Sequence, residues 1–258
     1  MNRQSLLRRT VWSAVALGFV TSVYAAGEAP QSIPGAALPK GHYAALDKLP
    51  DWGGIWTLNF PTPGSKRETP QLKGRYLTDY QAFQKDMEAN HGQARKKVSN
   101  CTPPGMPYIM AVGQYPIEFM FTPGRVTVHH EAWMQWRVIF TDGRPHADSE
   151  PNFNGNSIGK WEGDTLVVDT VNIKTSVALG PGMYHSDKFH IVERFSLDPK
   201  DKDTLRVQMT VEDPEALEKP YTNTLTFARS REGDLLEFIC AENDRNPVDS
   251  SGETTFEH

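Results

Sequence analysis

Cysteines, basic clusters and long hydrophobic runs are all scarce in this sequence. Cys101 and Cys240 are the only cysteines, and two cysteines cannot by themselves form a closed zinc site, which takes four ligands. The only basic cluster is Arg-Lys-Lys at residues 95–97, whereas nucleic-acid binding needs many such residues to neutralise phosphates. After residue 25, no apolar run approaches the roughly 20 residues that span a bilayer. The sequence therefore argues against a nucleic-acid partner and against stable membrane insertion.

The first 25 residues have the pattern of an export signal. Arg3, Arg8 and Arg9 form a positive start, residues 11–20 form a short apolar stretch, and small residues precede a cleavage point after Ala25. A membrane anchor is the alternative, but about ten apolar residues are short for one. Cleavage would remove three arginines and no acidic residue, which moves the net charge from −5 to about −8. We therefore expect a periplasmic or secreted protein with an acidic surface.

Export would place the two cysteines in an oxidising compartment. There, an even pair far apart in sequence indicates a disulfide between Cys101 and Cys240. Closing so long a loop would stabilise the fold by about 4–5 kcal/mol in the chain-entropy model. Two buried free thiols are the alternative.

The remainder of the chain divides into an arm, one domain and a tail. Residues 26–50 are rich in Ala, Pro and Gly and read as a partly ordered arm, residues 51–246 as a single domain, and residues 247–258 as a flexible tail. Within the domain, the spacing of aromatic and apolar residues predicts one substantial helix from Thr78, its N-cap, to about Arg95.

From residue 116 onward the pattern is that of β-strands separated by turn residues. The expected strands are 116–121, 125–131, 135–141, 157–162, 165–172, 188–196, 204–212, 222–229 and 234–241. Strands at this spacing without intervening helices predict an all-β fold, an antiparallel barrel with one N-terminal helix, with a β-sandwich as the alternative. Gly54-Ile55-Trp56 on a further strand resembles the Gly-x-Trp start of lipocalin-type barrels, which favours the barrel.

One carboxylate lies in an apolar row of the expected strand 188–196. Because side chains alternate across a strand, Glu193 shares a face with Phe189, Ile191 and Phe195. A carboxylate desolvated among such residues has a raised pKa and can serve as a general acid or base near neutral pH. The alternative is a buried ion pair with Arg137 or Arg144.

Other polar residues near this strand complete the predicted site. His146 and His185 lie in loops between strands and are further candidates for proton transfer. Arg137 and Arg144 can clamp a carboxylate or an oxyanion. His130, Glu131 and Asp169 complete the expected substrate-binding set.

Metal binding is a weaker hypothesis. His129 and Glu131 share one face of a strand and could ligate a metal with His185 or His190, but no spacing is diagnostic. We expect neither a metal nor a cofactor.

Several motifs are similar to those of a family of secreted bacterial proteins of unassigned function. They are Asp-Gly-Arg-Pro-His at 142–146, Ser-Ile-Gly-Lys-Trp-Glu-Gly-Asp-Thr-Leu-Val-Val-Asp-Thr at 157–170, the stretch from His185 to Phe195 and Thr-Val-Glu-Asp-Pro at 210–214. The resemblance runs from about Cys101 to Arg245. It implies no particular reaction. It implies that the residues at the positions of His129 and His130 usually differ in the family, which further weakens the metal hypothesis, and that these counterparts recur: Glu131, Arg137, Arg144, His146, Asp169, His185, Glu193 and Asp213.

Two functions from different classes fit these observations. The first is a periplasmic or secreted enzyme that applies acid–base chemistry to a small, partly apolar or aromatic molecule, as a lyase, an isomerase or a hydrolase. The second is a non-catalytic barrel protein that binds a small ligand. The enzyme is favoured because several titratable groups of opposite character recur in one short span. Nothing in the sequence indicates an oligomeric state.

Overall fold

The computed structural model describes residues 43–60, 68–92 and 101–240. The expected signal segment 1–25, the first part of the arm and the tail 247–258 lie outside these residues. The described elements are the 3-10 helices η1 (Tyr43–Lys48), η2 (Tyr108–Ala111) and η3 (Ala132–Met134), the α-helix α1 (Gly74–Ala89) and the strands β1 (Ile55–Leu58), β2 (Ile117–Thr122), β3 (Arg125–His130), β4 (Gln135–Phe140), β5 (Asn156–Glu162), β6 (Thr165–Val171), β7 (Ala178–Gly180), β8 (Met183–Tyr184), β9 (His190–Leu197), β10 (Thr204–Glu212) and β11 (Tyr221–Ser230).

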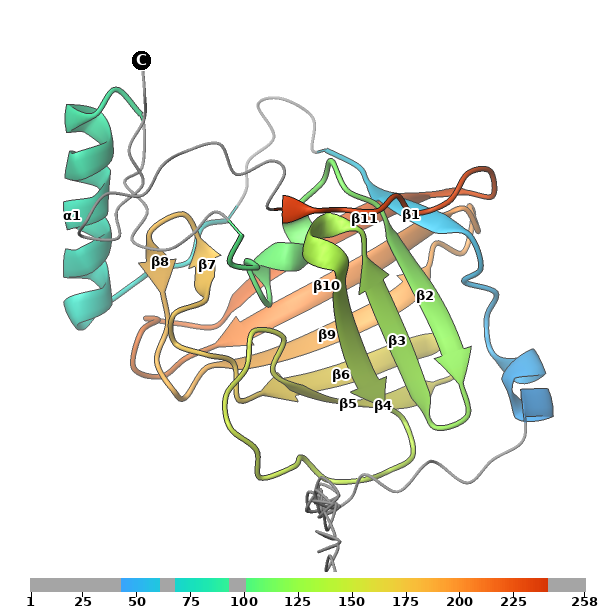
Figure 1. Cartoon of the computed structure of the whole chain (residues 1–258). Coiled ribbons are helices and arrows are strands. Elements are labelled where there is room, and N and C mark those ends of the chain that lie inside the picture. Colours follow the sequence, from blue (N-terminus) through green and yellow to red (C-terminus); the bar gives the residue numbers. More distant parts are fainter. Residues whose placement is uncertain (1–42, 61–67, 93–100, 241–258) are drawn as a thin grey trace, which may run out of the picture. The chain divides into compact units, whose positions relative to one another are not determined.

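Nine of these strands close into a barrel in the order β1-β11-β10-β9-β6-β5-β4-β3-β2 (Figure 1). The predicted all-β barrel with one helix is thus confirmed over the sandwich. The expectation of a purely antiparallel barrel is wrong at one seam, because β4 and β5 pair in parallel through Ile139–Ser157 and Phe140–Ile158. Parallel neighbours cannot be joined by a tight hairpin, and the chain here returns through the long loop 141–155.

One face of each strand fills the barrel interior. In β10, Leu205, Val207, Met209 and Val211 are buried whereas the residues that alternate with them are exposed or half-exposed, as the alternation of side chains along a strand requires. Full burial of a large apolar side chain contributes about 1.5–3 kcal/mol. This packed interior is therefore the main source of stability.

The Gly54–Trp56 motif lies at the seam where β1 meets β11. Trp56 is fully buried, and the guanidinium of Arg229, its partner on β11, lies 4.7 Å from the centre of its ring. Gly54 has φ +99°, and a Cβ there would lie 2.6 Å from the Ser230 carbonyl oxygen. Only glycine accommodates both the dihedral angle and the contact, so Gly54 lets the last strand close against the first.

The helix α1 differs from its prediction at both ends. It begins at Gly74, before the expected N-cap Thr78, and it ends at Ala89 rather than near Arg95. Its start is set by tertiary pairing, since the Lys73 N–H donates to the Ala216 carbonyl at 2.9 Å. The backbone is thus held in extended form up to Lys73, and the helix begins at the next residue.

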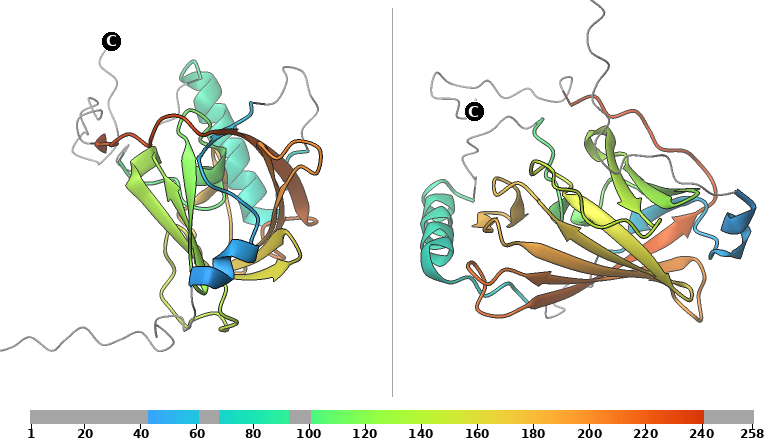
Figure 2. Two further views of the ribbon diagram at one scale, coloured as in Figure 1. Left: turned by 90° about the vertical axis from the view of Figure 1, so that its right-hand side faces the viewer. Right: turned by 90° about the horizontal axis from the view of Figure 1, so that it is seen from below.

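The short hairpin of β7 and β8 was not predicted. It lies beside α1 (Figures 1 and 2), and the ring of Phe83 packs directly on Gly182 in its turn. The described residues contain no helix with both the length and the hydropathy of a membrane span.

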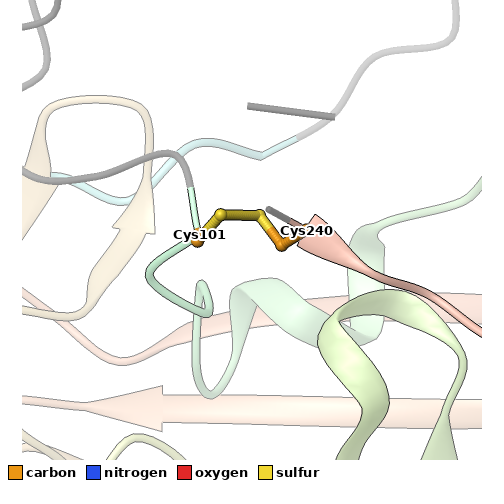
Figure 3. Close-up of a disulfide and its surroundings, with 2 residues drawn as sticks. All are labelled: Cys101 and Cys240. Carbon is orange, nitrogen blue, oxygen red and sulfur yellow. A yellow bond between two sulfur atoms is a disulfide. The ribbon is translucent and has the colours of Figure 1, made fainter. Parts of the chain in front are cut away.

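The strand expected at 234–241 does not form within the described residues up to Cys240. This segment is held instead by the Leu236 N–H, which donates to Glu131 Oε2 at 2.7 Å, and by a disulfide. Cys240 is bonded to Cys101 across a sequence separation of 139 (Figure 3). The predicted disulfide is therefore confirmed, and the predicted substrate residue Glu131 is engaged in anchoring this segment.

Candidate functional site

Arg137 and Glu193 form an ion pair inside the barrel. Their side chains are 1% and 0% exposed. Arg137 Nη1 donates to Glu193 Oε1 at 3.0 Å, and Nη2 donates to Oε2. The remaining guanidinium donors reach the hydroxyls of Ser157 on β5, at 3.2–3.3 Å, and of Thr170 on β6, at 2.9 Å. The sheet thus supplies every partner of a fully desolvated charge pair.

This arrangement matches the ion-pair alternative for Glu193, and the partner is Arg137 rather than Arg144. A buried charge is tolerated only when it is paired and hydrogen-bonded, as both charges are here. Neither side chain is reachable from solvent, so the geometry supports a structural role for Glu193 over proton transfer, and Arg137 is not free to clamp a substrate anion.

His130 lies in the same interior, with an exposed fraction of 1%. Burial foremost, together with the positive charge of Arg137 and the neighbouring His129, lowers its pKa to about 3. The ring is therefore neutral at physiological pH. No hydrogen bond between described residues reaches either of its nitrogens. His130 is thus a buried polar group whose desolvation is not compensated by the protein, rather than a surface ligand for substrate.

A second polar cluster lies on the outer face of four neighbouring strands. Asp169 Oδ1 lies 2.8 Å from Nε2 of His146 and 3.1 Å from Nε2 of His190. Nδ1 of His146 lies 2.8 Å from Oδ1 of Asn156, and Nδ1 of His190 lies 3.8 Å from Oε2 of Glu212. We call these five residues the outer histidine row.

The row is accessible, unlike the interior pair. Its central side chains are 26% (His146), 43% (Asp169) and 31% (His190) exposed. The sheet order explains the proximity, because β5, β6, β9 and β10 are consecutive neighbours and each contributes one member, while His146 joins from the loop between β4 and β5. Two imidazoles that share one carboxylate at a solvent boundary are groups that can exchange protons with a bound molecule.

Arg144, the other predicted anion clamp, is held by its own loop. Its Nε and Nη2 donate to the Asp142 carboxylate at 2.8 and 2.6 Å, and its guanidinium lies 4.0 Å from the centre of the Phe140 ring. The Arg144 guanidinium in turn lowers the pKa of Asp142. The arginine therefore organises the start of loop 141–155.

His185 is buried and belongs to a different loop. Its ring stacks on Phe189 with centroids 4.1 Å apart, and Nδ1 donates to the Ser186 carbonyl at 2.8 Å. Desolvation lowers its pKa, against the opposing effect of that carbonyl and of Asp213. Asp213 itself accepts from the N–H and the hydroxyl of Ser186, both at 2.7 Å. Among the described residues, no hydrogen bond, ion pair or ring contact joins His185 to Glu193 or to His146.

A surface pocket of about 520 Å³ lies just beyond the end of β6. Its lining combines apolar, amide and charged side chains, namely Glu150, Pro151, Asn172, Ile173, Lys174, Thr175, Ser176 and Asp187.

The pocket lies toward the same end of the barrel as the outer histidine row, although the two share no residue. Because β6 and β9 are antiparallel, going forward from Asp169 to Asn172 and backward from His190 to Asp187 leads to the same end of the barrel. The side chain of Asn172 also donates to the carbonyl of Ala147, the residue after His146.

Metal-site geometry is absent from the described ranges 43–60, 68–92 and 101–240. No group of three or more His, Cys, Asp or Glu side chains there is placed to hold a metal ion.

No protein-family model and no curated protein matches this sequence. The similarity to secreted bacterial proteins and to lipocalin-type barrels therefore stays an expectation drawn from the motifs.

Sequence reasoning left three members of the row out of the predicted site, namely Asn156, Glu212 and His190. The alternation on the expected strand 188–196 placed His190 on the face opposite Glu193, and this is the face that the structure turns toward solvent. Its contact with Asp169 depends on β6 pairing with β9. Since the β7–β8 hairpin intervenes in sequence, the pattern of residues gave no signal for this pairing.

Proposed function

We propose that the protein is a periplasmic or secreted enzyme that moves protons on a small, partly apolar or aromatic molecule. The observation that carries the proposal is the carboxylate of Asp169 between two half-exposed imidazoles, at 2.8 and 3.1 Å. An imidazole exchanges protons near neutral pH, and a carboxylate that accepts from one of its nitrogens fixes the ring's orientation.

In this proposal His146 and His190 carry the proton transfer and Asp169 holds them. We assign proton transfer to His146 and His190 rather than to Glu193 and His185, because the side chains of the latter two are buried. The pocket would hold the substrate, with Ile173 and Pro151 offering apolar surface and Asn172 an amide. A lyase, an isomerase or a hydrolase fits this set of groups, and export is supported by the signal-like N-terminal segment and by the Cys101–Cys240 disulfide.

The test is a survey of product formation with variants of the row. The purified protein is incubated with pools of phenolic and lipid-like compounds, and depletion and new products are followed by mass spectrometry. Removing a general acid or base costs roughly 10²–10⁴-fold in rate, so His146→Asn and His190→Asn should each abolish product formation. His129→Asn is the matched control, because His129 stacks on Trp136 at 3.9 Å, outside the row. Product formation that survives both row variants would overturn the proposal.

A non-catalytic ligand-binding protein is the second candidate. The specific observation in its favour is the pocket, since about 520 Å³ lies within the range of 300–1,000 Å³ that small-molecule sites occupy. The same survey separates the two functions. Compounds recovered bound but unchanged, with binding that persists in His146→Asn and His190→Asn, would favour the binding protein.

A further inference from the structure

The orientation of one amide determines the protonation of the outer histidine row. Asn156 Oδ1 accepts a hydrogen bond from the backbone N–H of Ala147 at 3.2 Å. A backbone N–H can only donate, so the oxygen rather than the amide nitrogen of Asn156 must face the loop at this point. The same oxygen lies 2.8 Å from Nδ1 of His146.

His146 therefore faces an acceptor on both sides. Nδ1 meets the carbonyl oxygen of the Asn156 amide, and Nε2 meets a carboxylate oxygen of Asp169 at 2.8 Å. An amide oxygen and an ionised carboxylate cannot donate. Only the doubly protonated ring supplies a donor to each, so the hydrogen-bond pattern is that of an imidazolium.

The second imidazole of the row, His190, has different neighbours at its two ring nitrogens. Nε2 of His190 lies 3.1 Å from Asp169 Oδ1, whereas its Nδ1 lies 3.8 Å from Oε2 of Glu212, beyond hydrogen-bond distance. Among the ring nitrogens of the row, Nδ1 of His190 is thus the one with no acceptor of the row within hydrogen-bond distance. It is the nitrogen placed to take a proton.

We infer that Asn156 is a positioning residue that holds His146 as a cation and leaves Nδ1 of His190 as the proton-accepting atom. The charged group in contact with His146 is Asp169 from β6. His190 from β9 lies next to Asp169, and Glu212 from β10 lies next to His190. Arg144, in the same loop as His146, pairs with Asp142. The assignment of His190 as the base rests on the proposed function, but the protonation of His146 does not.

The inference is tested by nitrogen-15 NMR of the histidine side chains in the full chain at neutral pH. Both ring nitrogens of His146 should carry the chemical shifts of protonated nitrogens. His129 provides a neutral reference ring in the same spectrum, because desolvation lowers its pKa. One unprotonated nitrogen on His146 in the wild-type protein would overturn the inference without any variant.

Variants of Asn156 test its part. Asn156→Leu keeps the side-chain size but removes the acceptor, so Nδ1 of His146 should lose its proton, and Asn156→Asp should restore it by supplying a carboxylate. Asn154→Leu, two residues earlier in the chain, is the matched control, since the Asn154 amide donates to the Trp136 carbonyl instead. An unchanged His146 spectrum in folded Asn156→Leu would refute the positioning role. If that variant does not fold, the wild-type and Asn156→Asp spectra decide.

A second readout separates this inference from the proposed function. Once a substrate is found, Asn156→Leu should shift the pH profile of kcat whereas Asn154→Leu should not. If no substrate turns over but His146 is doubly protonated, the proposed function fails and the role of Asn156 stands.

Discussion

The polar side chains of the predicted site differ in whether they lie inside the barrel or on its outer face. Alternation along the strand correctly predicted that Glu193 lies among buried apolar residues. It could not identify the partner, because Arg137 lies 56 positions earlier and faces Glu193 only once the barrel has closed. The interior pair is therefore a matter of stability, whereas the outer histidine row is open to solvent.

The first prediction concerns the interior ion pair. Removing one partner of a buried pair leaves an uncompensated charge and costs about 3–5 kcal/mol, so we expect Glu193→Gln to lower the free energy of unfolding by that amount. Urea unfolding followed by circular dichroism measures it. Glu162→Gln is the matched control, because the Glu162–Arg194 pair is 2.9 Å long but about half-exposed, and such pairs contribute about 0–1 kcal/mol. An equally small loss of unfolding free energy in both variants would contradict the structural role of Glu193 and would again make it a candidate for proton transfer.

The second prediction concerns the pH dependence that His130 imposes. Its pKa is lowered to about 3 in the folded protein but is near 6.5 in an unfolded chain. Between these values the unfolded state binds a proton that the folded state does not, so the free energy of unfolding should fall with decreasing pH, by up to about 1.4 kcal/mol per pH unit. Below pH 3 this contribution is constant.

Urea unfolding of wild type and His130→Leu at several pH values between 4 and 8 isolates that contribution. The variant lacks the titrating group, so its stability relative to wild type should rise steadily below pH 6.5. Parallel curves over this window would show that His130 is not buried as a neutral ring.

At the level of strands and helices, turn residues made most of the sheet predictable. The strands from β2 to β6 and from β9 to β11 lie close to their predicted ranges, because Gly-containing turns separate runs of alternating side chains. The expected strand 234–241 failed for a reason outside its own sequence. β11 already pairs with β10 on one side and with β1 on the other, so closure of the barrel leaves no edge for a further strand.

The candidate site shows the same limit. His146 and Asp169 were found as residue types in suggestive places, but their contact with each other and with His190 depends on which strands become neighbours. The parallel pairing of β4 with β5 and the pairing of β6 with β9 across the β7–β8 hairpin both join segments that are not linked by tight turns. Local patterns identify the residues of such a site and leave its assembly undetermined.

For the molecule as a whole, the disulfide connects two segments that the barrel ladders do not hold. Cys101 precedes η2, Cys240 follows β11, and neither residue belongs to a barrel strand. In the chain-entropy model, a crosslink across 139 positions stabilises the fold by about 4–5 kcal/mol, chiefly by restricting the unfolded chain. The segment that it ties down also carries the Leu236 contact with Glu131.

We therefore expect a reductant to lower the melting temperature of the wild-type protein by roughly 8–20 °C, since each kcal/mol corresponds to about 2–4 °C in a chain of this size. Differential scanning calorimetry with and without reductant measures the change. The double variant Cys101→Ser, Cys240→Ser should melt at the temperature of the reduced wild type and should not respond to reductant, which separates loss of the bond from other effects of the reagent. A wild-type melting temperature that ignores reductant would show that the bond does not form in solution, and it would remove the structural support for export to an oxidising compartment while leaving the outer histidine row, which contains neither cysteine, unaffected.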